Sequence, residues 1–246
     1  MGRRIIVYLI AIAALIGLWE VAAVSLQMAA FPTPVIAFAA FLQDLPHGLG
    51  RDLAISAWRV SISIVISLVL AVPLGLYLGR EEALDRFFAP LIYVTYPIPK
   101  IVLLPVIMAM CGLGNFSKIF LIALTIFFQI LVTTRDAARQ LERPLIDSVT
   151  SLGANKWQVY RHVIWPAVLP EILTALRIAS GTAIAVLFFA ETIASEDGLG
   201  YYLMDAWTRC DWADLFAGVI AMSILGLAIY MTLELIERRV CTWKYL

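Results

Sequence analysis

The sequence predicts an all-α membrane protein in which six helices cross the bilayer. Of its 246 residues, 62% are hydrophobic and only 15% are charged, whereas soluble domains are typically about 45–50% apolar and about 25% charged. The apolar residues fall into runs close to the roughly 20 residues that one helical crossing needs. Backbone groups in lipid must be hydrogen-bonded within their own segment, which favours helices for all of these runs.

The six predicted spans differ in how much polar character they contain. The first and last are clean except for Glu20 and Glu234, whereas the fifth contains Glu171, Arg177 and Glu191. The third holds four prolines, and the fourth is short and uncharged. No small-residue cleavage pattern follows the first run, so we expect a retained span rather than a removed signal peptide. In chain order the spans are residues 5–26, 53–78, 87–110, 119–134, 167–193 and 215–235.

The distribution of lysine and arginine in the loops predicts the orientation. With a cytoplasmic N-terminus, twelve of these residues lie inside and three outside, which is the bias that cytoplasmic loops show. Both termini are therefore expected in the cytoplasm, with outer loops at residues 27–52 and 194–214. The largest inner segment, residues 135–166, carries apolar side chains at roughly helical spacing, which indicates one or two short amphipathic helices at the membrane surface. The alternative is a linker that only follows the membrane.

No catalytic or metal-binding pattern accompanies these spans. The sequence lacks HExxH, G-x-S-x-G and the phosphate loop G-x-x-x-x-G-K-[ST]. The three cysteines, Cys111, Cys210 and Cys241, form no CxxC, although a pairing of the two outer ones stays open. The net charge is zero, so nothing suggests nucleic acid. We expect no enzyme activity, no catalytic residue and no bound metal or cofactor in this chain.

Polar residues inside the spans are the candidates for a translocation pathway or gate. A charge at membrane depth costs at least about 2.5 kcal/mol and therefore usually faces a partner or a water-filled cavity. Glu191 is predicted to have a structural or gating role, paired with Arg59 or, less favoured, with Lys100; the alternative is that it reaches outer water. The proline-rich stretch before Lys100 forms either a simple kink or a wall of the pathway. The candidates are Arg59, Tyr96, Pro97, Pro99, Lys100 and Glu191.

Two glycines at the inner end of the second span suggest close packing of helices. Gly75 and Gly79 match the pattern GxxxG, which lets two helix backbones approach closely.

The inner segment resembles the signature loop of ABC importer permeases. That family pattern is Glu-Ala-Ala, three residues, Gly, nine residues, then Ile-x-Leu-Pro. Gly153 and Pro166 match it at the right spacing, and Asp147 stands in place of the glutamate. Further stretches look like the permeases of nitrate, taurine, aliphatic sulfonate and bicarbonate importers: PIPKIVLLP at 97–105, LPEILTALRI at 169–178, AETI at 190–193 and GLGYYL at 198–203.

The resemblance implies a type I ABC importer permease fold with a cytoplasmic coupling helix. By the same resemblance the chain works as a homodimer with two cytoplasmic ATPase subunits, which use ATP and Mg²⁺, and with an extracytoplasmic solute-binding protein; we also expect contacts with membrane lipid. A glycine permits a tight turn between short helices, and large aromatic side chains suit an interface. The residues expected to couple to the ATPase are Asp147, Leu152, Gly153, Ala154, Trp157, Tyr160 and Pro166.

The sequence thus predicts an inner-membrane permease subunit for a small solute, an anion such as nitrate, sulfonate, taurine or bicarbonate. Residues 1–50 form the first span and an outer loop, residues 51–240 the permease core with its coupling loop at 141–166, and residues 241–246 a cytoplasmic tail. The alternative function is an ion-gradient-driven secondary transporter or channel, which has no reason to carry the Gly153 and Pro166 loop. An intramembrane enzyme is disfavoured because no catalytic constellation is present.

Overall fold

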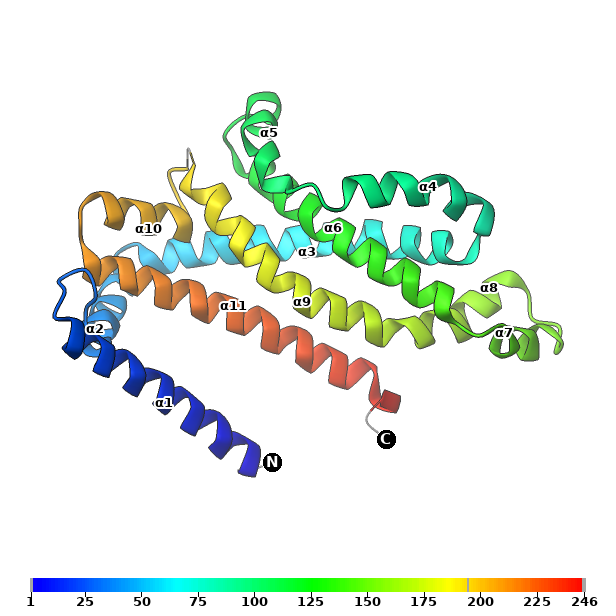
Figure 1. Ribbon diagram of the computed structural model, residues 1–246, viewed down its shortest axis with the longest axis horizontal. Coiled ribbons are helices and arrows are strands. Elements are labelled where there is room, and N and C mark those ends of the chain that lie inside the picture. Colours follow the sequence, from blue (N-terminus) through cyan, green and yellow to red (C-terminus); the bar gives the residue numbers. More distant parts are fainter. Residues whose placement is uncertain (1, 194, 245–246) are drawn as a thin grey trace. The chain divides into compact units, whose positions relative to one another are not determined.

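The computed structural model describes residues 2–193 and 195–244, and within these ranges every regular element is helical (Figure 1). Short 3₁₀ turns lie at Leu45–His47, Lys100–Leu103 and Thr242–Lys244, and one π-helical turn at Tyr160–Ile164. The α-helices are α1 (Gly2–Leu26), α2 (Pro34–Asp44), α3 (Leu49–Arg80), α4 (Glu82–Thr95), α5 (Leu104–Cys111), α6 (Asn115–Gln140), α7 (Arg143–Thr150), α8 (Lys156–Val159), α9 (Trp165–Thr192), α10 (Leu199–Thr208) and α11 (Trp212–Val240).

The chain divides into two compact units, each built from two separate stretches. One unit comprises Met1–Ser56 and Glu191–Leu225, and the other comprises Ala57–Ala190 and Gly226–Leu246. We call them the terminal unit and the central unit. The boundaries fall inside helices α3, α9 and α11, so these helices contribute residues to both units.

Among the described residues, four helices are long and apolar enough to cross a membrane: α3, α6, α11 and the continuous helix Lys156–Thr192. A fifth crossing is the pair formed by α4 and the segment Lys100–Cys111, which is bent by 79°. These five match the predicted spans after the first. Within α1, the part Ile10–Leu26 is a shorter apolar helix, so the sixth crossing stays a prediction.

Two expected loops contain helices. The outer stretch at 27–52 includes α2, and the stretch at 194–214 includes α10. Helix α2 begins after Thr33, with Pro34 in its first turn, where a missing N–H costs nothing. Within the terminal unit, Trp19 of α1 donates its indole N–H to the carbonyl of Pro32 at 3.0 Å and stacks on Phe216 at 5.5 Å.

The fifth span starts earlier than the sequence suggested. We expected a new helix near residue 167 with Pro166 in its first turn, but one helix runs without interruption from Lys156 to Thr192. The π-helical turn ends at Ile164, two residues before Pro166. Proline cannot donate an N–H and its ring crowds the carbonyl four residues earlier, and a wider turn at this point relieves both problems without ending the helix.

In the central unit, small side chains spaced four residues apart bring α3 close to α6. Ser63 and Ser67 donate hydrogen bonds to the carbonyls of Ile119 and Ala123, at 3.1 and 2.8 Å. Further along, a Cβ atom at Gly75 would lie 2.8 Å from the Cβ of Thr134. The predicted close-packing role of the two glycines is thereby confirmed, with α6 of the same chain as the partner.

Replacing Gly79 with alanine should destabilise the protein. The added Cβ would lie 2.5 Å from the carbonyl oxygen of Arg135 and 2.8 Å from the Cβ of Ala138, so α3 and α6 must separate, which typically costs about 1–3 kcal/mol. Gly226→Ala is the control, because its Cβ would meet only Ile184 at 3.8 Å. Thermal unfolding of the purified protein should show a lower midpoint for Gly79→Ala alone; equal midpoints would refute the close packing.

Candidate functional site

The segment between α6 and α9 is a pair of short helices joined by a tight turn. Helix α7 ends at Thr150, and Gly153 adopts a φ of +88° in the turn that follows. Asn155 then caps α8: its side chain accepts from the backbone N–H of Gln158 at 2.9 Å, while the Gln158 side chain accepts from the backbone N–H of Asn155 at 2.8 Å. This reciprocal capping box fixes the start of α8. We call residues 141–166 the coupling segment.

Large apolar side chains of the coupling segment project into solvent. The side chain of Leu152 is 88% exposed, that of Trp157 71% and that of Leu145 45%. Val159 and Ile164 are buried and hold the segment to the rest of the central unit. Of the remaining predicted coupling residues, Asp147 and Gly153 are exposed, whereas Ala154, Tyr160 and Pro166 are half-buried. Several of these residues therefore lie on a surface with apolar groups that nothing in the described chain covers.

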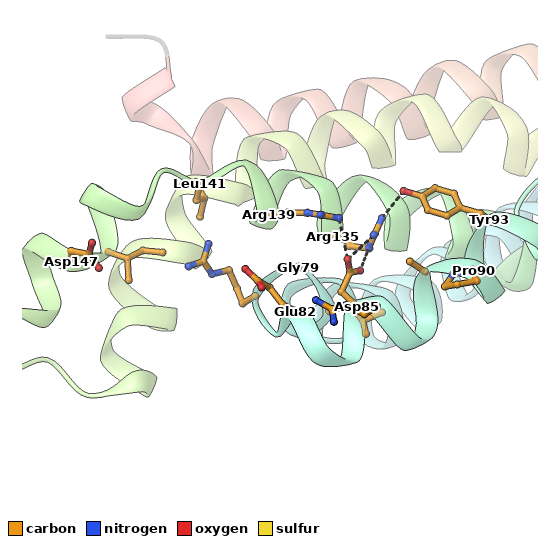
Figure 2. A pocket seen from close by; sticks show the side chains of 14 residues that line it. Gly79, Glu82, Asp85, Pro90, Tyr93, Arg135, Arg139, Leu141 and Asp147 are labelled. Atoms are coloured by element: carbon orange, nitrogen blue, oxygen red, sulfur yellow. Dashed lines mark hydrogen bonds and ion pairs between the residues drawn. The ribbon is translucent and has the colours of Figure 1, made fainter.

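A buried ion-pair cluster lies beside this segment, and the sequence did not reveal it. Arg135 of α6 is 1% exposed and holds both carboxylate oxygens of Asp85 from α4, one of them at 2.9 Å. Arg139 contacts the same carboxylate at 3.1 Å, and the Tyr93 hydroxyl lies 3.2 Å from Arg135. Figure 2 shows these four side chains meeting between α4 and α6. Both arginines lie just after the predicted fourth span. In the sequence, basic residues at such a position indicate the orientation of the chain but not a buried partner.

The side chain of Lys100 stabilises the break in the helix that follows α4. Its ammonium group donates to the carbonyls of Thr95 and Tyr96, at 2.7 and 2.6 Å, and lies 4.6 Å from the ring centre of Phe128. These carbonyls are among those that the end of a helix leaves without partners. Lys100 is buried, whereas the side chains of Tyr96, Pro97 and Pro99 are exposed on this chain. A role for these residues in the pathway stays a prediction.

Glu191 is fully buried, which excludes the alternative that it reaches outer water. Its carboxylate accepts from the Ser56 hydroxyl at 2.8 and 2.9 Å and from the backbone N–H of Gly200 at 2.9 Å. The Ser56 oxygen also accepts from the N–H of Leu199, and Asp52 accepts from that of Gly198, each at 2.8 Å. Glu191, Ser56 and Asp52 together thus accept from the free N–H groups at the start of α10, where negative charge is favoured.

Helix α10 has a second polar anchor within the terminal unit. The Tyr202 hydroxyl donates to the carboxylate of Asp44 at 2.5 Å. Burial, together with this hydrogen bond, raises the pKa of the Tyr202 phenol well above its usual range, so it remains a donor at physiological pH. Arg59, the favoured predicted partner of Glu191, lies in the central unit and donates to the Asn115 side chain at 2.5 and 2.8 Å. Its pairing with Glu191 stays a prediction.

Replacing Glu191 with glutamine should weaken the attachment of α10. Glutamine keeps the shape but replaces one acceptor oxygen with an amide that faces N–H and O–H donors, and an unsatisfied buried donor costs about 1–3 kcal/mol. Glu196→Gln is the matched control, because Glu196 is exposed. Thermal unfolding should fall to a lower temperature only for Glu191→Gln, without a change in which solute is transported. An altered solute preference would contradict the structural role.

No group of three or more histidine, cysteine or acidic side chains is placed to hold a metal ion within residues 2–193 and 195–244. The fold instead combines several apolar crossings, one of them broken, with an exposed helical segment between two of the spans. This combination defines a multi-pass membrane protein with an exposed helical segment outside the bilayer.

Comparison with known proteins identifies the family. The family described as binding-protein-dependent transport system inner membrane component matches residues 71–241. The chain therefore belongs to this family, the permease subunits of ABC importers, and is a multi-pass inner membrane protein. Members of the family work with ATPase and binding-protein partners in general.

Two relatives and one solved structure illustrate the match. The taurine transport system permease protein TauC of Escherichia coli is 31% identical over 195 residues, which cover 79% of this chain and 71% of TauC. SsuC of Bacillus subtilis, named as an aliphatic sulfonates transport permease, is 29% identical over 237 residues, covering 94% and 85%. An inward-facing structure of the MetNI methionine ABC transporter has a TM-score of 0.65 at 20% identity, covering 78% of this chain and 95% of that chain, and supports the fold.

Proposed function

We propose that two copies of this chain form the membrane pathway of an ATP-driven importer for a small anion, of the sulfonate, taurine, nitrate or bicarbonate type. Two cytoplasmic ATPase subunits, which bind ATP and Mg²⁺, and an extracytoplasmic binding protein complete the assembly. The observation that carries the proposal is the coupling segment: Leu152 and Trp157 are 88% and 71% exposed between two spans. Exposed aromatic and aliphatic side chains grouped in this way favour a protein partner.

The geometry of the coupling segment suits transmission of movement from an ATPase. The turn at Gly153 and the cap at Asn155 present α7 and α8 as a fixed pair. In this proposal, Leu152, Ala154 and Trp157 enter a groove on the surface of the ATPase, and Asp147 lies at the edge of that groove. Because α8 continues through Tyr160 and Pro166 into α9, displacement of the docked end would move a membrane span directly.

The bent crossing supplies a route for the solute in this proposal. Irregular backbone at membrane depth is tolerated only where it faces protein or a water-filled cavity, and the exposed side chains of Tyr96, Pro97 and Pro99 lie at the 79° bend. In the assembled dimer these residues would line the pathway, with Lys100 fixing the bend from behind. The names of TauC and SsuC support a sulfonate-like substrate.

ATP-driven uptake into proteoliposomes tests the proposed function. Vesicles containing the permease with its ATPase should accumulate labelled taurine only when ATP is inside and the binding protein outside. Collapse of ion gradients by an ionophore should leave this uptake unchanged. Uptake that depends on a gradient and persists without the ATPase would establish a secondary transporter instead.

The orientation has its own test. Cys210 is exposed and should react with a membrane-impermeant maleimide in intact spheroplasts when it is the only cysteine. Ser148→Cys in a cysteine-free background should react only after the membrane is opened, because the coupling segment is expected in the cytoplasm. The native Cys241 is unsuitable as the inner probe, because it is buried. Reaction of Ser148→Cys in sealed spheroplasts would reverse the assigned orientation.

A further inference from the structure

A cavity of about 730 Å³ opens beside the coupling segment, in the central unit. Its walls come from the end of α3, one face of α4, the second half of α6 and the first turns of the coupling segment. Because α3 and α6 both end here, the cavity lies at the boundary between the membrane and the aqueous phase. In the proposed orientation this boundary is the cytoplasmic one.

Arginines outnumber carboxylates in the lining of the cavity. Four arginines line it, against Glu82, Asp85 and Asp147. Asp85 is already saturated, because Arg135 and Arg139 occupy both of its oxygens.

Two of the arginines are available to a ligand. Arg80 makes only a 3.3 Å hydrogen bond to the carbonyl of Ala138, and Arg86 is exposed. Neither has an ion-pair partner within the described part of the chain. A guanidinium offers five N–H donors in a planar fork that fits phosphate oxygens.

The cavity also has an apolar stretch of wall, formed by the rings of Pro90 and Tyr93, although the Tyr93 hydroxyl contacts Arg135. Pro90 and Tyr93 of α4 lie at one end, while Leu141 and Asp147 lie at the other (Figure 2). On the face of α4 turned away from the cavity, Phe87, Leu91 and Val94 are 75%, 58% and 70% exposed, which suits contact of this helix with acyl chains. An inorganic anion would use only the charged end, whereas a phospholipid would use both.

We propose that this cavity binds the headgroup of an anionic phospholipid. Arg80 and Arg86 contact the phosphate, and an acyl chain follows the wall formed by Pro90 and Tyr93. Basic pockets between membrane helices on the cytoplasmic side bind such headgroups. The bound lipid joins α4 and α6 to the start of the coupling segment, so the composition of the bilayer would influence coupling. Only the assignment to the cytoplasmic leaflet rests on the proposed function.

Lipid retention measured by native mass spectrometry tests the proposal without any transport assay. The purified permease complex is exchanged into phosphatidylglycerol or phosphatidylcholine and compared with Arg86→Gln and with Arg80→Gln/Arg86→Gln. Arg239→Gln is the matched control, because Arg239 is exposed and lies outside the cavity. Affinity for phosphatidylglycerol should fall roughly fivefold for each cavity arginine removed, and the control should match the wild type. If the double variant does not fold, the comparison of Arg86→Gln with the wild type tests the proposal.

The outcomes separate the sources of the anion. Equal retention of the two lipids by the wild type, or equal phosphatidylglycerol retention by wild type and Arg86→Gln, would overturn the site. Thermal stabilisation of lipid-free protein by inorganic phosphate, lost in Arg86→Gln and unmatched by phosphatidylglycerol, would overturn the lipid in favour of a free anion. A complex that fails to transport but retains phosphatidylglycerol as expected would disprove the proposed function alone.

Discussion

Replacing Gly153 with valine should reduce coupled transport about tenfold or more while leaving the permease folded. Gly153 has a φ of +88°, and this left-handed region costs an ordinary L-residue about 1–2 kcal/mol and is a genuine outlier for β-branched side chains. A Cβ atom here would meet nothing within 4 Å, so the loss comes from the backbone of the turn and not from a clash within the chain. The measurement is uptake together with ATP hydrolysis stimulated by the loaded binding protein.

Gly153→Asn is the matched control, because asparagine tolerates the left-handed region. It should keep most of the transport if the conformation of the turn is what matters. Equal loss in both variants would show instead that the ATPase approaches the Gly153 backbone too closely for any side chain. Normal coupled transport in Gly153→Val would be incompatible with a docking role for this turn.

Replacing Asp85 with asparagine should lower the free energy of unfolding by about 3–5 kcal/mol, because it removes the buried carboxylate that pairs with the buried Arg135. Arg135 is 1% exposed and donates two of its hydrogen bonds to this carboxylate, which is the buried one of its two acidic partners. Asparagine keeps the shape but retains one acceptor oxygen and no charge. The readout is chemical or thermal unfolding of the assembled transporter.

Asp136→Asn provides the comparison, because Asp136 also contacts Arg135, at 3.0 Å, but its side chain is 43% exposed. An ion pair open to solvent contributes about 0–1 kcal/mol. The cluster would be disproved as a stabilising element if the two variants unfolded alike. In addition, Asp85→Asn combined with Arg135→Gln should lose less than the sum of the single changes, as expected for residues in direct contact.

Apolar length and proline position were sufficient to predict most of the fold. Five crossings lie where hydrophobic runs suggested, and the bend falls at Pro97 and Pro99, where proline removes donors from the ladder. The π-helical turn before Pro166 could not be predicted, because the same residues also suit a loop followed by a new helix. Helix α10 was missed because the acidic stretch around it dominates the composition of residues 194–214.

The candidate site was predictable where its signal is local. Gly153 and Pro166 stand out by their spacing alone. Asn155 and Gln158 have the spacing of a capping box, which is a local signal for the start of α8. The contacts of Asp85 with Arg135, and of Ser56 with Glu191, join residues 50 and 135 positions apart. Such pairs depend on how helices pack, which no local pattern in a single sequence encodes.

The uninterrupted helix Lys156–Thr192 has a mechanical consequence. At 1.5 Å per residue, its 37 residues form a rod of about 55 Å, so a twist applied at Trp157 reaches the far end of the span without passing through a hinge loop. The π-helical turn is the only irregular joint between α8 and α9. Deleting one residue there would rotate α8 by about 100° relative to the span, so that the surface proposed to contact the ATPase would face another direction.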